Sequence, residues 1–342
     1  MNSPIDALKI ISQQYLPAIE EHLVHSLTRA STNQSEVLHD MLAYHMGWQG
    51  EGAGAEARGK RIRPLLVLLS NAAAGGDWER GLPAASAVEL VHNFSLIHDD
   101  IEDNSPLRRG RLTVWKLWGI PQAINAGDAM FALAHLEILR LQETTSASIA
   151  IQAVRLLLNT CLRLTQGQYL DLSYENRPKL SLDDYWLMIA GKTATLIATC
   201  ARLGALIAGG SEELQELYWN FGRTLGLAFQ VQDDLLGIWG EAELTGKSAT
   251  SDLVTGKKSL PILFGLSQKG MFAQRWLQGP INEEEGADVA RLLEQDGGRA
   301  YAEKIAEQLT NQALETMEQA QLEGLAGSAL RQLTNQLLNR KV

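Results

Sequence analysis

Two groups of aspartates interrupt otherwise apolar stretches of this chain. The first is the run HDDIED at residues 98–103. On a helix, Asp99 and Asp103 are i, i+4 neighbours, so their carboxylates project from one face with Cβ atoms about 5–6 Å apart. Like charges this close destabilise a helix unless a cation lies between them. Hard oxygen ligands on one face suit Mg²⁺, which takes one or two carboxylates and completes its shell with water and substrate phosphate oxygens. A solvated acidic helix end is the alternative interpretation.

The second group is the pair Asp233-Asp234, within FQVQDDLLG at residues 229–237. Adjacent acids with apolar residues on both sides are hard to keep wholly solvated, so a solvated surface explains this pair less well. Acidic groups on two apolar helices can face each other across a bundle, which is a known way of building metal sites in helical proteins. The pattern therefore predicts metal ions that bridge a polyanionic ligand.

Basic residues lie close to these acids in the sequence. They are Lys60, Arg61 and Arg63 in GKRIRP (59–64), Arg108, Arg109 and Arg111 after the first acidic run, Lys192 in mid-chain, and Lys247, Lys257 and Lys258 after the second. Arginine offers a bidentate fork to phosphate, and lysine offers a point charge. Each group alone indicates surface charge. Their occurrence together with two aspartate groups favours phosphate binding.

Helices must position these residues. A hydrophobic period of 3.6 dominates and a period of 2 is nearly absent, which predicts an all-α fold. One helix is expected over Ala84–Asn104, entered just after Pro83. Ser181 with Asp184 resembles a capping box that opens another helix.

The rest of the chain continues this pattern. A helix is expected from Ser211 to about Gly240, and others over 283–295 and 299–322, each charged on one side. Residues 47–59, rich in glycine, are expected to form a mobile linker, and residues 245–258 a loop. Since no linker separates two parts of the sequence, a single domain over residues 1–342 is expected.

Composition narrows the function classes. The 342 residues are 45% hydrophobic and 20% charged, which is typical of a globular protein. The net charge of −10 argues against general nucleic-acid binding. Cys161 and Cys200 lie in apolar periodic stretches and are interpreted as reduced core thiols of a cytoplasmic protein. The N-terminus does not resemble a signal peptide. The apolar segment 193–210 is short and contains Arg202, so stable membrane insertion is not expected.

Taken in order, the motifs resemble those of the trans-isoprenyl diphosphate synthases, the polyprenyl synthetase family, and most closely its geranylgeranyl diphosphate synthases. The matching elements are GKRIRP (59–64), ELVHNFSLIHDDIEDNSPLRRG (89–110), GQYLDL (167–172), GKTATL (191–196), FQVQDDLLG (229–237) and GKSATSDLVTGKKSLP (246–261). The resemblance implies an isoprenoid synthase bundle of antiparallel helices around a deep central cavity, working as a homodimer. It also implies head-to-tail condensation of isopentenyl diphosphate with an allylic diphosphate, helped by three Mg²⁺.

The resemblance also implies roles for individual residues. Asp99 and Asp103, supported by Asp100, and Asp233 match the family's Mg²⁺ ligands. Arg108, Lys192, Lys257 and Lys247 match residues that hold the allylic diphosphate. Lys60, Arg63, His92 and Arg109 match positions that bind isopentenyl diphosphate. Thr193 and Gln230 match positions near the developing cation, and Asp171 resembles a carboxylate near the metals and Lys192.

The implied chemistry agrees with the residue types. Diphosphate leaves well only when its growing charge is neutralised, as metal ions with arginine and lysine do in a water-poor site. The isopentenyl double bond then attacks the allylic cation, and proton loss restores the alkene. This route needs no enzyme nucleophile, in agreement with the lack of a Ser/His/Asp or Cys/His constellation. The chain departs from the family at Gly237, where the consensus has a third aspartate, so the second acidic site is expected to be less charged than usual.

Product length in this family follows from what blocks the hydrocarbon tunnel beneath the first aspartate motif. Ser95 lies one turn before Asp99 and is small, whereas the bulky Phe94 lies about 7.5 Å before Asp99 along the helix axis. This pattern resembles one geranylgeranyl (C20) synthase type. A C15 or a C25 product is an alternative, and Phe94 could also simply pack in the core without limiting the product.

Two other functions share these motifs. A diphosphate-ionising terpene cyclase or lyase would need the metal motifs but not the isopentenyl site, whose residues are intact. A non-catalytic regulatory subunit would be expected to lose the aspartates or the basic residues, and both are present. His98, beside Asp99, is expected only to orient the motif.

Overall fold

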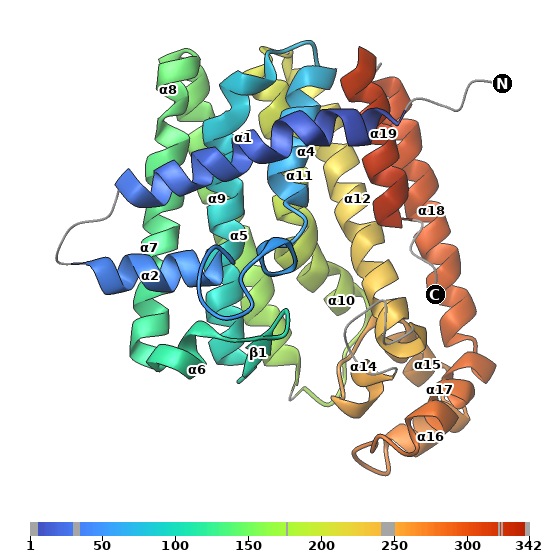
Figure 1. Cartoon of the computed structure of the whole chain (residues 1–342). Helices are drawn as coiled ribbons and strands as arrows, with labels where there is room; N and C mark the ends of the chain where they lie inside the picture. The colour runs from blue at the N-terminus through green and yellow to red at the C-terminus, as the bar shows by residue number, and fades with distance from the viewer. Residues whose placement is uncertain are drawn as a thin grey trace. The chain divides into compact units, whose positions relative to one another are not determined.

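The computed structural model is almost entirely helical (Figure 1), which confirms the all-α prediction. It describes residues 6–29, 35–175, 177–240, 250–320, 322 and 324–338. The chain divides into two compact units. Unit 1 comprises Met1–Leu158, Cys200–Gln215 and Leu322–Leu330, and unit 2 comprises Asn159–Thr199, Glu216–Gln321 and Arg331–Val342. Most of the boundaries between the units fall inside helices, namely α9 (Ala147–Glu175), α11 (Thr195–Ile207), α12 (Glu212–Trp239) and α19 (Gly324–Leu338). The expected single domain over residues 1–342 stays a prediction.

Unit 1 is organised around one buried helix, α5 (Leu82–Glu102), which packs against α1, α4 and α7. Its other elements are α1 (Ala7–Arg29), α2 (Glu36–His45), α3 (Ala55–Arg58), α4 (Ile62–Ala73), η1 (Trp78–Gly81), α6 (Val114–Trp118), α7 (Ile120–Leu139) and α8 (Leu141–Thr144). Helix α5 was expected over 84–104. It begins two residues earlier because proline is tolerated in a first helical turn, and Pro83 lies there. It ends two residues earlier because Asn104 adopts a left-handed φ of 51°.

A short hairpin follows α5, where the sequence indicated only helices. Strands β1 (Leu107–Arg108) and β2 (Arg111–Leu112) pair antiparallel, with Arg108 opposite Arg111. The two turn residues, Arg109 and Gly110, have φ values of 51° and 73°, as a type I′ turn requires. Strands of two residues are too short to show a period of 2, so the hydrophobic pattern could not reveal them.

The glycine-rich segment 47–59 is hydrogen-bonded to the hairpin, so the expectation of a mobile linker was wrong. The Arg111 guanidinium donates to the carbonyl oxygens of Tyr44, Gln49 and Glu51 at 2.7–2.8 Å. It also lies 3.9 Å from the centre of the Tyr44 ring. One arginine therefore satisfies backbone oxygens at the end of α2 and in the loop between α2 and α3.

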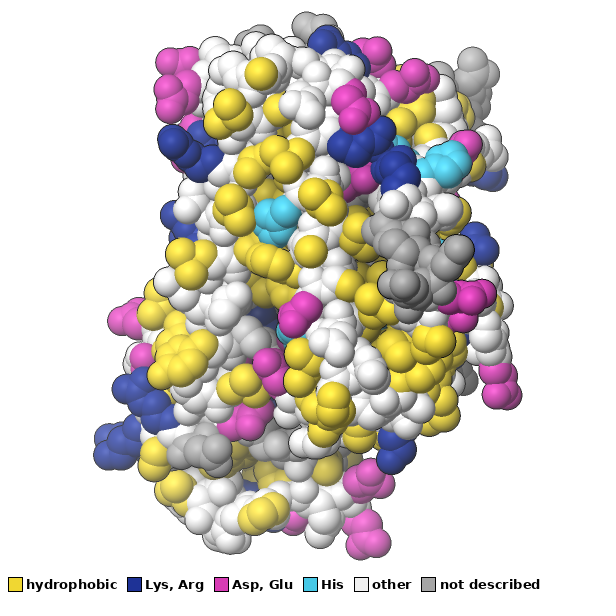
Figure 2. Space-filling model, turned by 90° about the vertical axis from the view of Figure 1, so that its left-hand side faces the viewer, with side chains coloured by type: hydrophobic (Ala, Val, Ile, Leu, Met, Phe, Trp, Pro, Cys, Tyr) yellow, Lys and Arg dark blue, Asp and Glu magenta, His cyan; other side chains and the backbone are white. Residues whose placement is uncertain are grey.

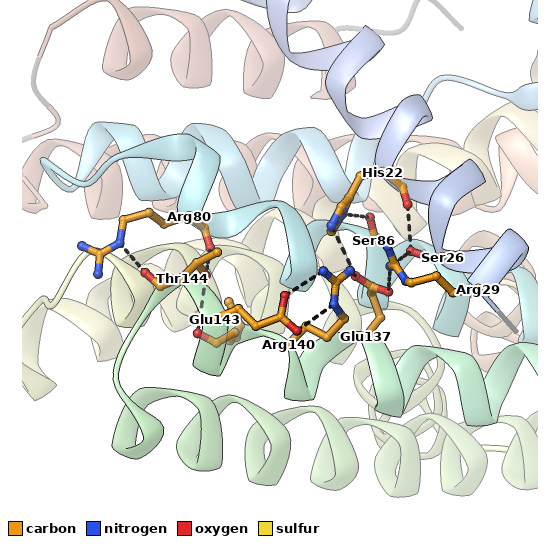
Figure 3. Close-up of polar contacts among 10 residues, drawn as sticks. His22, Ser26, Arg29, Arg80, Ser86, Glu137, Arg140, Glu143 and Thr144 are labelled. Carbon is orange, nitrogen blue, oxygen red and sulfur yellow. Dashed lines mark hydrogen bonds and ion pairs between the residues drawn. The ribbon is translucent and has the colours of Figure 1, made fainter.

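A buried glutamate connects α1 to α7 (Figure 3). The Glu137 carboxylate, 4% exposed, accepts from Arg29 at 2.7 Å and Arg140 at 3.1 Å, and lies 3.3 Å from His22 Nε2. His22 Nδ1 lies 3.3 Å from Ser86 Oγ on α5. A buried carboxylate is tolerated when cations surround it in this way, so the network fixes the position of α1 on the other two helices.

Unit 2 contains parts of α9 and α12 and several shorter elements. These are α10 (Leu182–Ile189), the π-helical segment η2 (Ala190–Ala194), α14 (Ser251–Val254), α15 (Leu260–Gln268), α16 (Met271–Trp276), α17 (Gly286–Gln295) and α18 (Gly298–Gln319). The predicted capping box is confirmed, because Ser181 and Asp184 bond reciprocally at the start of α10. The expected loop 245–258 contains α14, and its residues 245–249 lie outside the described part of the chain.

Two further sequence expectations concern membrane insertion and the cysteines. The segment 193–210, which was not expected to insert, contains all of α11. Among the described residues, α9 is the one helix long and apolar enough to cross a membrane, and this is weak evidence for a membrane span because core helices of soluble proteins pass the same test. Both Cys161 and Cys200 are free and buried, as expected. Burial raises the pKa of the Cys161 thiol to about 11 and that of Cys200 to about 12, so both stay protonated near neutral pH.

Candidate active site

The first aspartate group lies at the C-terminal end of α5. Asp99 is in the last turn, and Asp103 follows as the C-cap, its backbone N–H donating to the Asp99 carbonyl at 2.8 Å. This end of a helix carries the negative pole of the helix dipole. Several carboxylates therefore crowd where negative charge is least favourable, and a bound cation would relieve the repulsion.

Asp100 differs from its neighbours, because it is buried and bound to Arg108. The Arg108 Nε and Nη2 atoms lie 2.8–3.0 Å from the Asp100 carboxylate oxygens. Burial raises the pKa of Asp100, and the Arg108 guanidinium partly opposes that rise. In this structure Asp100 anchors the hairpin arginine to α5, and its expected contribution to a metal site stays a prediction.

Arg109 brings the hairpin onto the GKRIRP segment. Its Nη1 donates to the Ala57 carbonyl at 2.7 Å. A Cβ atom on Gly59 would lie 2.6 Å from Arg109 Nη2, so a side chain at this position would displace the guanidinium from its present place. Gly59 also has a φ of 74°, which favours glycine. Two motifs fifty residues apart in the sequence thus meet through one glycine.

Arg61, for which no separate role was predicted, holds the same segment from inside. It is buried, with a left-handed φ of 47°. Its guanidinium donates to Glu20 of α1 at 2.5 Å, to Glu89 of α5 at 2.9 Å and to the Met46 carbonyl at 3.2 Å. These bonds fix the start of α4, and with it the flanking Lys60 and Arg63.

In unit 1, the surroundings of His92 include Arg63 and Arg109. The binding of isopentenyl diphosphate by these three residues, which the resemblance implies, stays a prediction. Burial lowers the pKa of His92, and the nearby Arg63, Arg109 and Arg108 lower it further. His45 joins this group without having been predicted. Burial, with Arg108 and Arg109 close by, lowers the pKa of His45 to about 3. Both imidazoles are therefore neutral beside a concentration of positive charge, as in a pocket for an anion.

A small pocket opens beside His45 and Arg109. Its lining also includes Tyr44, Asp100, Arg108 and Arg111, but neither His92 nor Arg63. Lys60, the fourth predicted isopentenyl diphosphate residue, is exposed one residue before Arg61. The sequence signal for His45 was absent, because nothing in its spacing relates it to the other motifs.

In unit 2, a local distortion of the helix presents Lys192 and Thr193. Both lie in the π-helical segment η2, a type of irregularity frequent at functional sites. Two glycines allow the backbone of η2 to approach α9 closely. A Cβ atom on Gly167 would lie 2.1 Å from the Lys192 nitrogen, and one on Gly191 would lie 2.8 Å from the Arg163 carbonyl oxygen. Lys192 forms an ion pair with Asp171 of α9, as the sequence interpretation suggested.

A chain of hydrogen bonds then leads to the second aspartate pair. Thr193 Oγ1 donates to Gln230 Oε1 at 2.8 Å, and Gln230 Nε2 donates to Asp234 Oδ1 at 3.0 Å. The buried Asp234 also accepts from the Tyr185 hydroxyl at 2.8 Å and from the Leu260 backbone N–H at 3.0 Å. Asp234 therefore orients its neighbours, whereas Asp233 is only half-buried, as a residue that contacts a ligand must be.

The second predicted lysine group is partly described. Lys257 Nζ lies 3.5 Å from Asp234 Oδ1 and 3.7 Å from Asp252 Oδ2, and these acids raise the pKa of Lys257 against the effect of burial. Lys258 has a structural role, since its Nζ donates to the carbonyls of Tyr174 and Glu175 at the end of α9 and of Arg177 just past it. Lys247 lies outside the described residues.

The two residues predicted to govern product length lie on α5 as expected. Phe94 is buried, 9% exposed, and packs edge-on against Phe131 of α7 with ring centres 5.1 Å apart. It also packs edge-on against His98, at 5.8 Å. Ser95 is half-buried, and its hydroxyl donates to the His92 carbonyl at 2.8 Å.

Mg²⁺ fits the donors at the end of α5. Asp99 is half-buried and Asp103 is exposed, so both carboxylates can reach a bound ion. Within the described part of the chain, no group of three or more His, Cys, Asp or Glu side chains is assembled to hold a metal.

Comparison with known proteins identifies the family. A sequence model described as polyprenyl synthetase matches residues 53–295. The chain belongs to the polyprenyl synthetase family. It is similar to the (2E,6E)-farnesyl diphosphate synthase of Mycobacterium tuberculosis, with 36% identity over 344 residues, 97% of this chain and 95% of that protein. The geranylgeranyl diphosphate synthase of the same organism is 39% identical over 302 residues, 86% of this chain and 85% of that protein.

Comparison with solved structures supports the same family. A polyprenyl synthetase from Streptomyces coelicolor superposes with a TM-score of 0.85 at 35% identity, covering 97% of this chain and 98% of that one. The predicted all-α isoprenoid synthase fold is therefore confirmed, and this family member is a prenyltransferase that makes trans-prenyl diphosphates. Its relatives include both farnesyl and geranylgeranyl synthases, so they do not decide the product length.

Proposed function

We propose that this enzyme condenses isopentenyl diphosphate with an allylic diphosphate in the presence of Mg²⁺ and makes mainly geranylgeranyl diphosphate. One observation supports the condensation: Arg63 of the motif at 59–64 lies near His92 and Arg109 of the motif at 89–110, and the imidazoles of His92 and His45 are neutral. An enzyme that only ionised an allylic diphosphate would not need this second anion site.

The side chains divide the work according to their chemistry. In this proposal Asp99, Asp103 and Asp233, with Asp100 in support, hold three Mg²⁺, which neutralise the leaving diphosphate when bound. Arg108, Lys192, Lys247 and Lys257 hold the allylic diphosphate. Lys60, Arg63, His92 and Arg109 hold isopentenyl diphosphate. The hydrogen-bonded pair Thr193 and Gln230 stabilises the developing cation through its oxygen dipoles.

Phe94 supports the proposed C20 product. Its ring is buried and held by Phe131, so it cannot swing aside without unpacking an aromatic pair. We expect Phe94→Ala to shift the main product to longer chains, and Ser95→Phe to shift it to shorter ones. Phe94→Leu, which keeps most of the volume, is the matched control and should shift the product less than Phe94→Ala.

We also propose that the enzyme is a cytoplasmic homodimer, formed through the exposed face of α7. Ile120, Ile124, Phe131, Leu136 and Leu139 are exposed along this helix. Figure 2 shows that face, where hydrophobic side chains are widespread and lysine and arginine lie toward the edges. Such a face fits a second copy of the chain. Leu136→Glu should convert the dimer to a monomer in analytical ultracentrifugation, and an unchanged mass would exclude this interface.

The deciding experiment is a product assay with labelled isopentenyl diphosphate, Mg²⁺ and C5, C10 or C15 allylic starters. A C20 main product supports the whole proposal, and a different linear length keeps the chemistry and rejects Phe94 as the limit. If no condensation occurs but a starter loses diphosphate to give a hydrocarbon or alcohol, the enzyme is a cyclase or lyase.

A further inference from the structure

A pocket of about 310 Å³ lies in unit 2, among α10, η2, α12 and α18, and none of the predicted site residues lines it. Its apolar lining consists of Trp186, Ala190, Leu227, Ile305 and Leu309. Leu227 belongs to the buried core of the unit, and the other four side chains are partly buried against that core. The pocket is therefore an opening in the wall of a hydrophobic core, where apolar surface stays in contact with solvent. Apolar surface in a concave place is typical of a ligand-binding site.

The rest of the lining is polar, and one of its residues is charged. Arg223 of α12 and Gln308 and Gln312 of α18 are exposed at the pocket. Within the described part of the chain, the Arg223 guanidinium and the two side-chain amides form no ion pair or hydrogen bond. Of the described residues that line the pocket, none is acidic. The guanidinium therefore offers an anion a bidentate partner beside two amide donors.

The volume of the pocket sets the size of its ligand. A water molecule takes about 30 Å³ in the liquid, so about 310 Å³ accommodates roughly ten groups of that size. This volume is at the lower end of the range for small-molecule pockets, about 300–1,000 Å³. An eight-carbon chain that ends in a carboxylate or phosphate has the required size, the required apolar surface and the charge opposite to that of Arg223.

The pocket also touches the segment that carries Lys192. Ala190 is the first residue of η2, and its carbonyl oxygen accepts from the Thr195 backbone N–H and, at 2.9 Å, from the Thr195 hydroxyl. The first of these bonds closes a π-helical turn, an irregularity that is rare and frequent at functional sites. Lys192 lies within this turn and is paired with Asp171. A ligand packed against Ala190 would restrain the turn, and with it the position of Lys192.

The same ligand would contact α12 close to the second aspartate motif. Leu227 lies three residues before Gln230, which is about one helical turn, and Gln230 accepts from Thr193 of η2 at 2.8 Å. A Cβ atom on Gly226 would lie 2.6 Å from Ala194 Cα, so α12 and η2 are in close backbone contact there. Densely packed elements transmit a displacement of one to the other. The pocket is thus mechanically connected to residues of the candidate active site.

We propose that this pocket binds a small amphipathic anion, with an apolar part of about eight carbons against the core and a carboxylate or phosphate on Arg223. The bound anion restrains η2 with Lys192 on Asp171 and so weakens the binding of a diphosphate. This regulatory effect rests on the proposed function, in which Lys192 holds the allylic diphosphate, whereas the binding site itself does not.

The first experiment measures binding without turnover. Octanoate and octyl phosphate are each titrated into the full-length protein by isothermal titration calorimetry, and the tighter of the two shows which anionic group the pocket prefers. 1-Octanol lacks the charge and butanoate lacks most of the chain, so each should bind about tenfold or more weaker than octanoate. Equal binding of 1-octanol and octanoate, or no saturable binding of either anion, would overturn the proposal.

Variants locate the bound anion. Arg223→Gln should weaken octanoate binding about fivefold or more, because it removes the cation. Gln312→Trp, which fills the pocket from α18, should abolish binding. Arg331→Gln on α19 and Asn311→Trp on α18 change exposed residues outside the lining, so these matched controls should bind like the wild type. All four positions are exposed, so the Tm should not change. Wild-type affinity in both Arg223→Gln and Gln312→Trp would assign the anion to the substrate cavity and refute the proposal.

The second experiment tests the regulatory effect. Saturating octanoate should weaken the binding of inorganic pyrophosphate with excess Mg²⁺ about fivefold or more, and by linkage pyrophosphate should weaken octanoate binding by the same factor. Arg223→Gln should bind pyrophosphate like the wild type, and the same octanoate concentration should weaken that binding less. If octanoate saturates the wild type and leaves pyrophosphate affinity unchanged, the regulatory effect is refuted.

These outcomes separate the inference from the proposed function. The titrations need no turnover, so they decide the binding site whatever the enzyme makes. If octanoate binds through Arg223 but no condensation product forms, only the proposed function fails. If condensation occurs and octanoate binds Gln312→Trp as tightly as the wild type, only the anion site fails.

Discussion

Replacement of Arg61 by methionine should destabilise the protein strongly, because it leaves a buried carboxylate without its cation. Arg61 is 2% exposed and its partner Glu89 is 4% exposed. Breaking such a pair from one side costs about 3–5 kcal/mol. The second pair, with the 21% exposed Glu20, adds at most about 1 kcal/mol.

The expected shift in Tm follows from the size of the chain. An unfolding entropy of about 2.1 cal/mol/K per residue gives about 0.7 kcal/mol/K for 342 residues. A loss of about 3–5 kcal/mol therefore lowers the Tm by about 4–7 °C. Thermal unfolding followed by far-UV circular dichroism measures this shift. KM for isopentenyl diphosphate should rise in the same variant, since Arg61 fixes the backbone between Lys60 and Arg63.

A double variant tests the physical cause. Arg61→Met with Glu89→Gln removes both charges, so no buried carboxylate is left unpaired, and we expect it to recover more than half of the lost Tm. A single variant with a shift below 2 °C would refute the reasoning. So would a double variant that is as unstable as the single one.

Three further predictions can be checked with the same preparations. Asp99→Ala should lower kcat by orders of magnitude and leave the helical signal intact, because removing one of several crowded like charges relieves repulsion; an unchanged kcat would contradict the metal assignment. His45 stays neutral in the folded protein, with a pKa of about 3, but takes up a proton below about pH 6.5 when unfolded. Stability should therefore fall by up to about 2 kcal/mol between pH 7 and pH 5 in the wild type, and less in His45→Gln; parallel urea-unfolding curves for the two would exclude this coupling. Tyr185→Phe removes the 2.8 Å hydrogen bond to Asp234 and should cost about 1.5–3 kcal/mol, seen as a lower urea midpoint at constant m-value. No change in that midpoint would show that Asp234 is satisfied without Tyr185.

Local chemistry explains which parts of the fold could be predicted. The capping box at Ser181 and the ends of α5 and α12 follow from residue types that act within a few positions, so the sequence pattern located them to within two residues. The hairpin at Arg109 was missed because a two-residue strand has no period. The glycine-rich segment 47–59 was misjudged because its order comes from Arg111, more than fifty residues away.

The site residues likewise divide into those that the local sequence reveals and those that depend on contacts between distant residues. The aspartates and basic residues could be found because their types and spacing are visible along the chain. Arg61 and Asp234 could not be separated from ligand-binding neighbours, because burial, which the sequence does not state, makes them positioning residues.

By itself, the sequence determined the all-helical fold class, the family and the chemical types gathered for diphosphate binding. These depend on hydrophobic periodicity and on motifs of neighbouring residues. The tertiary structure decided which charges are buried, which are shared and which remain available for a ligand. That division depends on desolvation and on distances of a few ångströms between residues far apart in the chain, so no pattern along the chain can specify it.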